Sequence, residues 1–282
     1  MGMPVSVLLR GPDVDGGRVG RAVGEVFAEL HRLEAVFSMF RADSDVRRWI
    51  RGEVGLRECD PTVAEVVDLC IEAEHRTDGA FSAWLPPTPA PTPTPGFVPR
   101  AHTDLYALAG QSEIGGGGVG AAGFDPTGLV KGWAVERAAQ RLVALGDHDV
   151  CLNAGGDVVL WTVADDAPAW RVGIENPADT RQVLAVVEIR RGALATSGSA
   201  HRGQHIVDPA SGTAAGELWS ASVCGPSLLW ADVYATAAVV KGSAALAWLE
   251  TTDDYDVLVV DRDGGVVMTK GFPVAGGSGP AA

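Results

Sequence analysis

Residues 124–132 read Phe-Asp-Pro-Thr-Gly-Leu-Val-Lys-Gly, and this stretch decides how the chain is organised. Asp125 stands before the first turn of a predicted helix, and Gly128 and Lys131 lie within that turn. Backbone N–H groups of a first turn have no partners within the helix, so an acid, a glycine and a lysine here suit a nucleotide or its metal ion. An ordinary capped helix with Lys131 in solvent would show the same residues. A second polar turn, Asn-Ala-Gly-Gly-Asp at 153–157, follows, and together the two turns predict one half of an active site.

Outward from this stretch, apolar periodicity divides the chain into helices and strands. The predicted helices cover 17–37, 60–77, 128–145, 227–240 and 244–249. The predicted strands cover 4–9, 150–152, 158–163, 170–174, 183–189, 193–196, 218–224, 256–260 and 264–269, while 38–45 is expected to form a polar turn. Because helices and runs of strands are segregated along the chain, we expect an α+β fold with a largely antiparallel sheet and packed helices. We expect a single domain, 1–282, with an irregular excursion rich in proline and glycine at about 86–123.

The chain is acidic, with 22 Lys and Arg against 36 Asp and Glu and a formal net charge of -14. Such a surface repels phosphate backbones, which argues against nucleic acid as a partner. The N-terminal residues carry no visible signal peptide or lipid-attachment cysteine, and no stretch approaches the roughly 18 apolar residues of a membrane span. We therefore expect a cytoplasmic protein without a membrane span, exported only if an upstream segment is missing.

Two later stretches carry side chains suited to the other half of a site. Asp232 and Thr236 are four residues apart, so on a helix their carboxylate and hydroxyl share one face, which suits Mg²⁺. His205 opens the sequence His-Ile-Val-Asp-Pro, where it suits a base or a donor to phosphate. Zinc binding by His201 and His205 would need a helix, and the glycine and proline nearby disfavour one.

Taken together and in this order, the polar stretches resemble the motifs of the ApbE family, the FAD:protein FMN transferases. The matching pieces are Met1-Gly-Met3, Ser38-Met-Phe40-Arg41 with Ser44, Thr77-Asp-Gly-Ala-Phe-Ser82, Asp125 to Gly132, Asn153 to Asp157, Thr196-Ser-Gly198, His205 to Pro209 and Asp232 to Thr236. Each piece is short, but they follow the family order over nearly the whole chain.

The resemblance implies an enzyme that cleaves the FAD pyrophosphate, attaches FMN through a phosphoester to a threonine of a target protein and releases AMP. It implies Mg²⁺ held by Asp232, Thr236 and the backbone carbonyl of Gly128. It implies that His205 assists transfer and that Asp232 is also catalytic. The implied FAD contacts are Met1, Phe40, Ala80, Phe81, Ser82, Asp125, Lys131, His205 and Ile206.

Three features depart from the family pattern. Phe40 stands where the family has tyrosine, Ser82 stands where it usually has aspartate, and the chain begins almost at the first motif although many relatives are exported lipoproteins. Two alternatives to transfer stay open: an FAD pyrophosphatase that gives FMN and AMP, because water and threonine attack the same phosphorus, and a non-catalytic FAD-binding protein. The presence of Asp232, Thr236 and His205 favours an enzyme.

Overall fold

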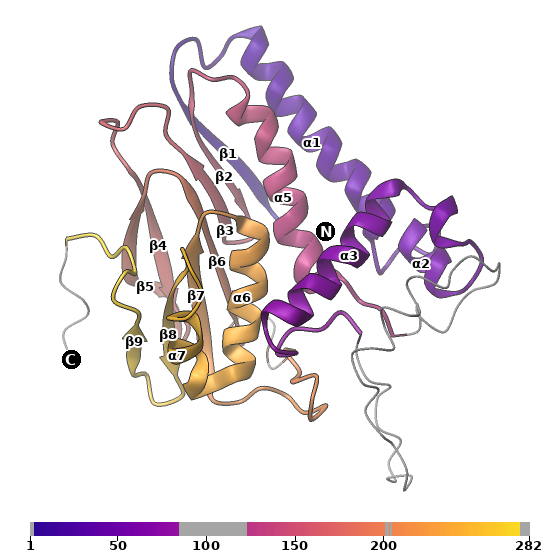
Figure 1. Cartoon of the computed structure of the whole chain (residues 1–282). Helices are drawn as coiled ribbons and strands as arrows, with labels where there is room; N and C mark the ends of the chain where they lie inside the picture. Colours follow the sequence, from indigo (N-terminus) through magenta and orange to yellow (C-terminus); the bar gives the residue numbers. More distant parts are fainter. Residues whose placement is uncertain (1–2, 85–122, 201–202, 204, 277–282) are drawn as a thin grey trace, which may run out of the picture.

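A computed structural model describes residues 3–84, 123–200, 203 and 205–276, and one antiparallel sheet organises them (Figure 1). Its seven strands, in spatial order, are β1 (Val5–Arg10), β2 (Asp149–Ala154), β3 (Asp157–Trp161), β6 (Gly192–Gly198), β7 (Leu218–Gly225), β8 (Asp256–Asp261) and β9 (Val266–Met268). Each neighbouring pair in this order is antiparallel. A separate antiparallel hairpin consists of β4 (Trp170–Asn176) and β5 (Asp179–Ile189).

Helices cover one face of the sheet, and the β4–β5 hairpin covers the other (Figure 1). The helical layer contains α1 (Gly17–Phe37), α2 (Asp45–Ile50), η1 (Leu56–Glu58), α3 (Pro61–Arg76), α5 (Thr127–Val143), α6 (Leu228–Lys241), η2 (Gly242–Ala244) and α7 (Ala245–Leu249). Two hydrophobic cores result, one between helices and sheet and a smaller one between sheet and hairpin. None of the described helices combines the length and the apolar character that crossing a membrane requires.

The α+β fold and the largely antiparallel sheet are confirmed, as are the long helices. The prediction of a plain turn at 38–45 was wrong at its end, because residues 45–50 form α2. Ser44 caps this helix by accepting the N–H of Arg47 at 3.3 Å. Strand β5 begins at Asp179, earlier than predicted, because the chain turns directly out of β4. The proline- and glycine-rich excursion lies almost wholly outside the described residues, and the single-domain assignment stays a prediction.

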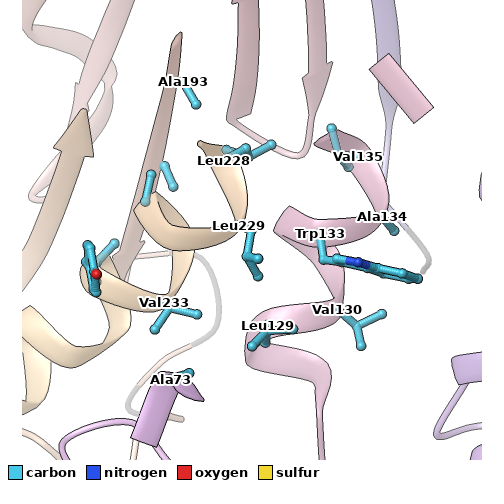
Figure 2. Packing of buried hydrophobic residues seen from close by; sticks show 14 of the residues in the cluster. Ala73, Leu129, Val130, Trp133, Ala134, Val135, Ala193, Leu228, Leu229 and Val233 are labelled. Carbon is cyan, nitrogen blue, oxygen red and sulfur yellow. The ribbon is translucent and has the colours of Figure 1, made fainter. Parts of the chain in front are cut away.

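Helices α5 and α6 run antiparallel and pack closely, and the site depends on this contact. Figure 2 shows Leu228 at the level of Val135, and Val233 at the level of Leu129. Gly132 makes the approach possible, because a Cβ atom there would lie 2.8 Å from the Leu228 carbonyl oxygen and 3.0 Å from the Asp232 Cβ. Real Cβ atoms do not come this close to a backbone oxygen, so glycine is required at this position.

We predict that Gly132→Ala lowers the free energy of unfolding by about 1–3 kcal/mol, because the added methyl forces α5 and α6 apart. Gly24→Ala is the matched control, since a Cβ at Gly24 on α1 would meet nothing within 4 Å. That change should raise stability by about 0.5–1 kcal/mol through helix propensity alone. Denaturant unfolding followed by circular dichroism measures both, and equal responses would contradict the close contact.

Candidate active site

Two adjoining cavities share the start of α5. The smaller lies against α6 and the turn after α3, and the larger lies against the end of α1 and the residues that follow it. The smaller, about 200 Å³, is lined by Ala80, Phe81 and Ser82 after α3, by Asp125, Thr127, Gly128 and Lys131 at the start of α5, by Ser197, His205, Ile206, Val207 and Pro209, and by Asp232 and Thr236 on α6. The larger, about 630 Å³, is lined by Met3, by Glu34, Phe37, Ser38, Met39, Phe40 and Arg41, and by Thr127, Val130 and Lys131. Because Thr127 and Lys131 line both, the cavities meet at the first turn of α5.

The turn after α3 holds the wall of the smaller cavity in place. Thr77 is buried, and its hydroxyl oxygen accepts the N–H of Phe81 at 3.0 Å. The Phe81 ring then packs on Gly128, where a Cβ atom would lie 3.0 Å from the ring carbon Cε2. At the start of α5, Asp125 Oδ1 accepts the N–H of Thr127 at 3.0 Å. Gly128 therefore lines the cavity, and the Phe81 ring edge lies against the side of Gly128 where a side chain would begin.

Lys131 stands between two buried carboxylates, Asp157 at the start of β3 and Asp232 on α6. Its ammonium pairs with Asp157 Oδ2 and lies 3.5 Å from Asp232 Oδ1. The Asp157 and Asp232 side chains are only 1% and 3% exposed. Two carboxylates and one ammonium leave a net negative charge in a buried place, which is costly without another cation or a proton. Burial accordingly raises the pKa of Asp232 above its ordinary value; the Lys131 ammonium lowers this pKa and the Asp157 charge raises it.

Asp232 and Thr236 present their oxygens one helical turn apart on α6. Asp232 Oδ2 accepts the N–H of Gly132 at 3.2 Å, and the Thr236 hydroxyl lies 3.0 Å from that of Ser197. No group of three or more His, Cys, Asp or Glu side chains converges on one point among the residues that the structure describes. A metal ion at this place would therefore be held by oxygen atoms of different kinds, namely carboxylate, hydroxyl and carbonyl oxygens. Such donors, next to the net negative charge of Lys131, Asp157 and Asp232, fit a hard cation such as Mg²⁺.

His205 enters the smaller cavity from the loop after β6 and is exposed to solvent. Its Nδ1 lies 3.0 Å from the carbonyl oxygen of Gly203. Because a carbonyl only accepts, Nδ1 carries the hydrogen, and in a neutral ring the lone pair is then on Nε2. Asp208 does not orient this ring; it closes its own turn by accepting the N–H of Ala210 at 2.9 Å and the hydroxyl of Ser211 at 2.8 Å. His201, the other residue of the zinc alternative, lies outside the described residues.

Phe40 stands at the wall of the larger cavity with 99% of its surface exposed. The Ser38 hydroxyl oxygen accepts the N–H groups of Phe40 and Arg41, both at 3.3 Å. The buried Ser44 hydroxyl donates to the Ser38 carbonyl oxygen at 2.7 Å. Side-chain hydrogen bonds thus hold the turn that presents the ring to water beside an apolar cavity. An aromatic face in this position suits stacking against a planar ligand.

The structure brings together nearly all of the residues predicted from the sequence. Phe40 lines the larger cavity, Met1 lies outside the described part of the chain, and all the others line the smaller cavity. Sequence reasoning missed the contacts of Asp157 and Ser197, although both stand in motifs that it recognised. Their partners, Lys131 and Thr236, lie on α5 and α6, so these contacts depend on how the two helices pack against the sheet, which the motifs do not specify.

Comparison with known proteins gives one consistent result. The model of the ApbE family matches residues 1–89 and 117–259. A protein of Vibrio cholerae serotype O1 named FAD:protein FMN transferase is 26% identical over 266 residues, which cover 86% of this chain and 80% of that protein. A protein of the same name from Haemophilus influenzae is 24% identical over 274 residues, covering 86% and 79%.

Solved structures show the same fold. The ApbE protein from Thermotoga maritima superposes with a TM-score of 0.74 at 18% identity, covering 95% of this chain and 94% of that one. The flavinyl transferase ApbE from Pseudomonas stutzeri, in its apo form, gives a TM-score of 0.68 at 26% identity, covering 96% and 97%. The family match includes the turn after α3, the start of α5 and the polar face of α6, which are the elements that form the smaller cavity. The chain therefore belongs to the ApbE family.

Proposed function

We propose that this protein is a Mg²⁺-dependent FAD:protein FMN transferase, which attaches FMN to a threonine of a target protein and releases AMP. One observation carries the proposal: Lys131 lines both an apolar cavity and a polar one, and its ammonium contacts two buried carboxylates. Relatives that align over 86% of the chain bear the name FAD:protein FMN transferase. Family membership and a site of matching chemistry thus support the same reaction.

FAD has planar rings at both ends and a pyrophosphate between them, and the two cavities suit these parts. In a chain of net charge -14, the N-terminal end of α5 supplies positive potential for a pyrophosphate. Lys131 can donate a hydrogen bond to it, although the two neighbouring carboxylates outweigh its charge. The exposed Phe40 ring suits stacking with one of the planar ends. We propose that the remaining contacts come from the walls of the smaller cavity, namely Ala80, Phe81, Ser82, Asp125 and Ile206.

We propose Asp232, Thr236 and the carbonyl of Gly128 as the ligands of Mg²⁺. The bound ion would screen the pyrophosphate charge and polarise its phosphoryl oxygens. The net negative charge of the buried Lys131, Asp157 and Asp232 side chains supports a cation here. The Lys131 side chain lies between the two carboxylates, is 24% exposed and lines both cavities, so it is within reach of a substrate in either one.

In the proposed transfer step, the threonine Oγ forms a bond to the FMN phosphorus, and the bond from that phosphorus to the AMP oxygen breaks. Nε2 of His205 takes the proton of the threonine hydroxyl, since Nδ1 is held by the Gly203 carbonyl. A base of this kind contributes roughly 10²–10⁴-fold to a rate. Alignment of the attacking oxygen with the phosphorus supplies much of the remaining rate enhancement.

Hydrolysis is a second candidate function, because His205 is exposed to solvent. Water can reach this face of the cavity, and the same base would activate it. The protein would then act as an FAD pyrophosphatase that gives FMN and AMP.

The reaction is tested by incubating the protein with FAD, Mg²⁺ and proteins or peptides that carry an acceptor threonine. We expect AMP release together with a mass increase on the acceptor equal to one attached FMN. AMP without an adduct on any acceptor would support hydrolysis instead, and bound FAD without AMP would support a non-catalytic FAD-binding protein.

We predict that Asp232→Asn lowers Mg²⁺-stimulated AMP release by about 10³-fold, because a metal ion contributes several kcal/mol to such a step. Stability should be maintained, since asparagine still offers an oxygen to the Gly132 N–H and removes the uncompensated charge. AMP release against Mg²⁺ concentration and denaturant unfolding measure the two quantities. Unchanged turnover at saturating Mg²⁺ would show that the metal assignment is wrong.

We predict that His205→Gln lowers the turnover number by about 10²–10⁴-fold while FAD binding, followed by flavin fluorescence, stays unchanged. Glutamine keeps a polar side chain of similar reach but has no basic nitrogen. His31→Gln is the control, because His31 is an exposed residue of α1 that lines neither cavity. A loss of FAD affinity with a normal turnover number would assign His205 to binding rather than to proton transfer.

A further inference from the structure

A carboxylate outside both cavities joins the two helices that carry the proposed metal ligands. Glu136 lies on α5 eight residues after Gly128, which places it about 12 Å along the helix axis. Its Oε2 accepts the hydroxyl of Ser227 at 2.7 Å and the backbone N–H of Leu229 at 2.9 Å. Both partners belong to the N-terminal end of α6, so these bonds connect the middle of one helix to the beginning of the other.

The contact acts as an N-terminal cap that a neighbouring helix supplies. Ser227 is the N-cap residue of α6, and its oxygen also lies 3.5 Å from the N–H of Trp230. The first turn of a helix has N–H groups without intrahelical partners and a positive dipole end, so a carboxylate there is stabilising. Glu136 satisfies one of these groups at Leu229. Because it comes from α5, it also fixes where α6 begins relative to α5.

The remaining contacts between the two helices show why this register matters. Three residues spaced four apart on each helix take part, namely Gly128, Gly132 and Glu136 on α5 and Leu228, Asp232 and Thr236 on α6. At the middle of the two rows, Gly132 donates its N–H to Asp232 and leaves no room for a side chain. The cavity lies at the other end of the same rows, at Gly128 and Thr236. A shift of α6 along α5 would therefore move all the α6 oxygens relative to the Gly128 carbonyl.

We infer that Glu136 is a positioning residue, which sets the register of α6 against α5 and so aligns Asp232 and Thr236 with the carbonyl of Gly128. The inference rests on the proposed function, because it takes these three groups as metal ligands. Glu136 itself touches neither metal nor FAD, since it lines neither cavity and its hydrogen bonds within the described part of the chain go to the start of α6. Outer partners that orient metal ligands typically contribute 10–100-fold to metal affinity or activity.

The test uses Glu136→Ala, which removes both hydrogen bonds, and Glu136→Gln, which keeps an oxygen acceptor but no charge. We expect the Mg²⁺ concentration for half-maximal AMP release to rise by about tenfold or more in Glu136→Ala and by less in Glu136→Gln. Direct binding of Mn²⁺, followed by the loss of its free electron paramagnetic resonance signal with no FAD present, should weaken in the same order. FAD binding without metal should be unchanged.

Asp60→Ala is the matched control, because Asp60 caps α3 away from the α5–α6 contact. Its Oδ1 accepts the N–H of Thr62 at 3.0 Å, so this variant loses a helix cap of similar kind. It should lose stability without a change in metal dependence. If the Glu136 variants lose stability as Asp60→Ala does and keep the wild-type Mg²⁺ and Mn²⁺ dependence, the inference is wrong and Glu136 is only structural. If Glu136→Ala does not fold, Glu136→Gln decides by the same two readouts.

The failure of the inference and that of the proposed function are distinguishable. A wild-type protein that binds Mn²⁺ but releases no AMP from FAD contradicts the proposed reaction, and the Mn²⁺ series of variants still tests Glu136. A wild-type protein that binds no Mn²⁺ with or without FAD overturns the positioning role together with the metal assignment.

Discussion

The ammonium of Lys131, placed between two buried carboxylates, is the constraint on which the rest of the site depends. It draws together the start of α5, the first residue of β3 and the second turn of α6, since Lys131, Asp157 and Asp232 come from these three elements. Asp157 is fixed from the sheet side as well, because its Oδ1 accepts the N–H of Thr196 at 3.1 Å. Charges buried in this way are tolerated only with well-formed partners. The charged groups of the site therefore come together only when α5 and α6 are both packed against the sheet.

The two sides of the site differ in how firmly the fold holds them. On one side, α5 and α6 meet at Gly132 with no space for a methyl group, and buried residues surround the contact. On the other side, His205 lies on an exposed loop, where a local bond to Gly203 orients its ring. A rigid base for charge and a more accessible side for the attacking group suit an enzyme whose second substrate is itself a protein.

The sequence predicted the fold class and most of the residues that line the smaller cavity, for identifiable reasons. Helix α5 was predictable because its apolar positions recur at helical spacing and Gly146 follows it. Helix α2 was missed because it has six residues and only Val46 among them is buried, so it shows no periodicity. Asp232 and Thr236 were predictable because their spacing on one helix already places them together. The contact of Asp157 with Lys131 was not, because it depends on the packing of α5 against the sheet, which a linear pattern does not contain.

The hydrogen bond from Gly132 to Asp232 joins residues 100 positions apart in the chain. Strands β2 to β7 lie between them in the sequence, so this contact closes a long loop of the chain. Contacts of such long sequence separation generally slow folding, because the chain loses loop entropy before they form. During synthesis, a chain that ends before α6 would thus hold Lys131 and Asp157 without Asp232. The site is therefore complete only once α6 has packed, and a ligand that needs both helices would bind only the completed fold and stabilise it by mass action.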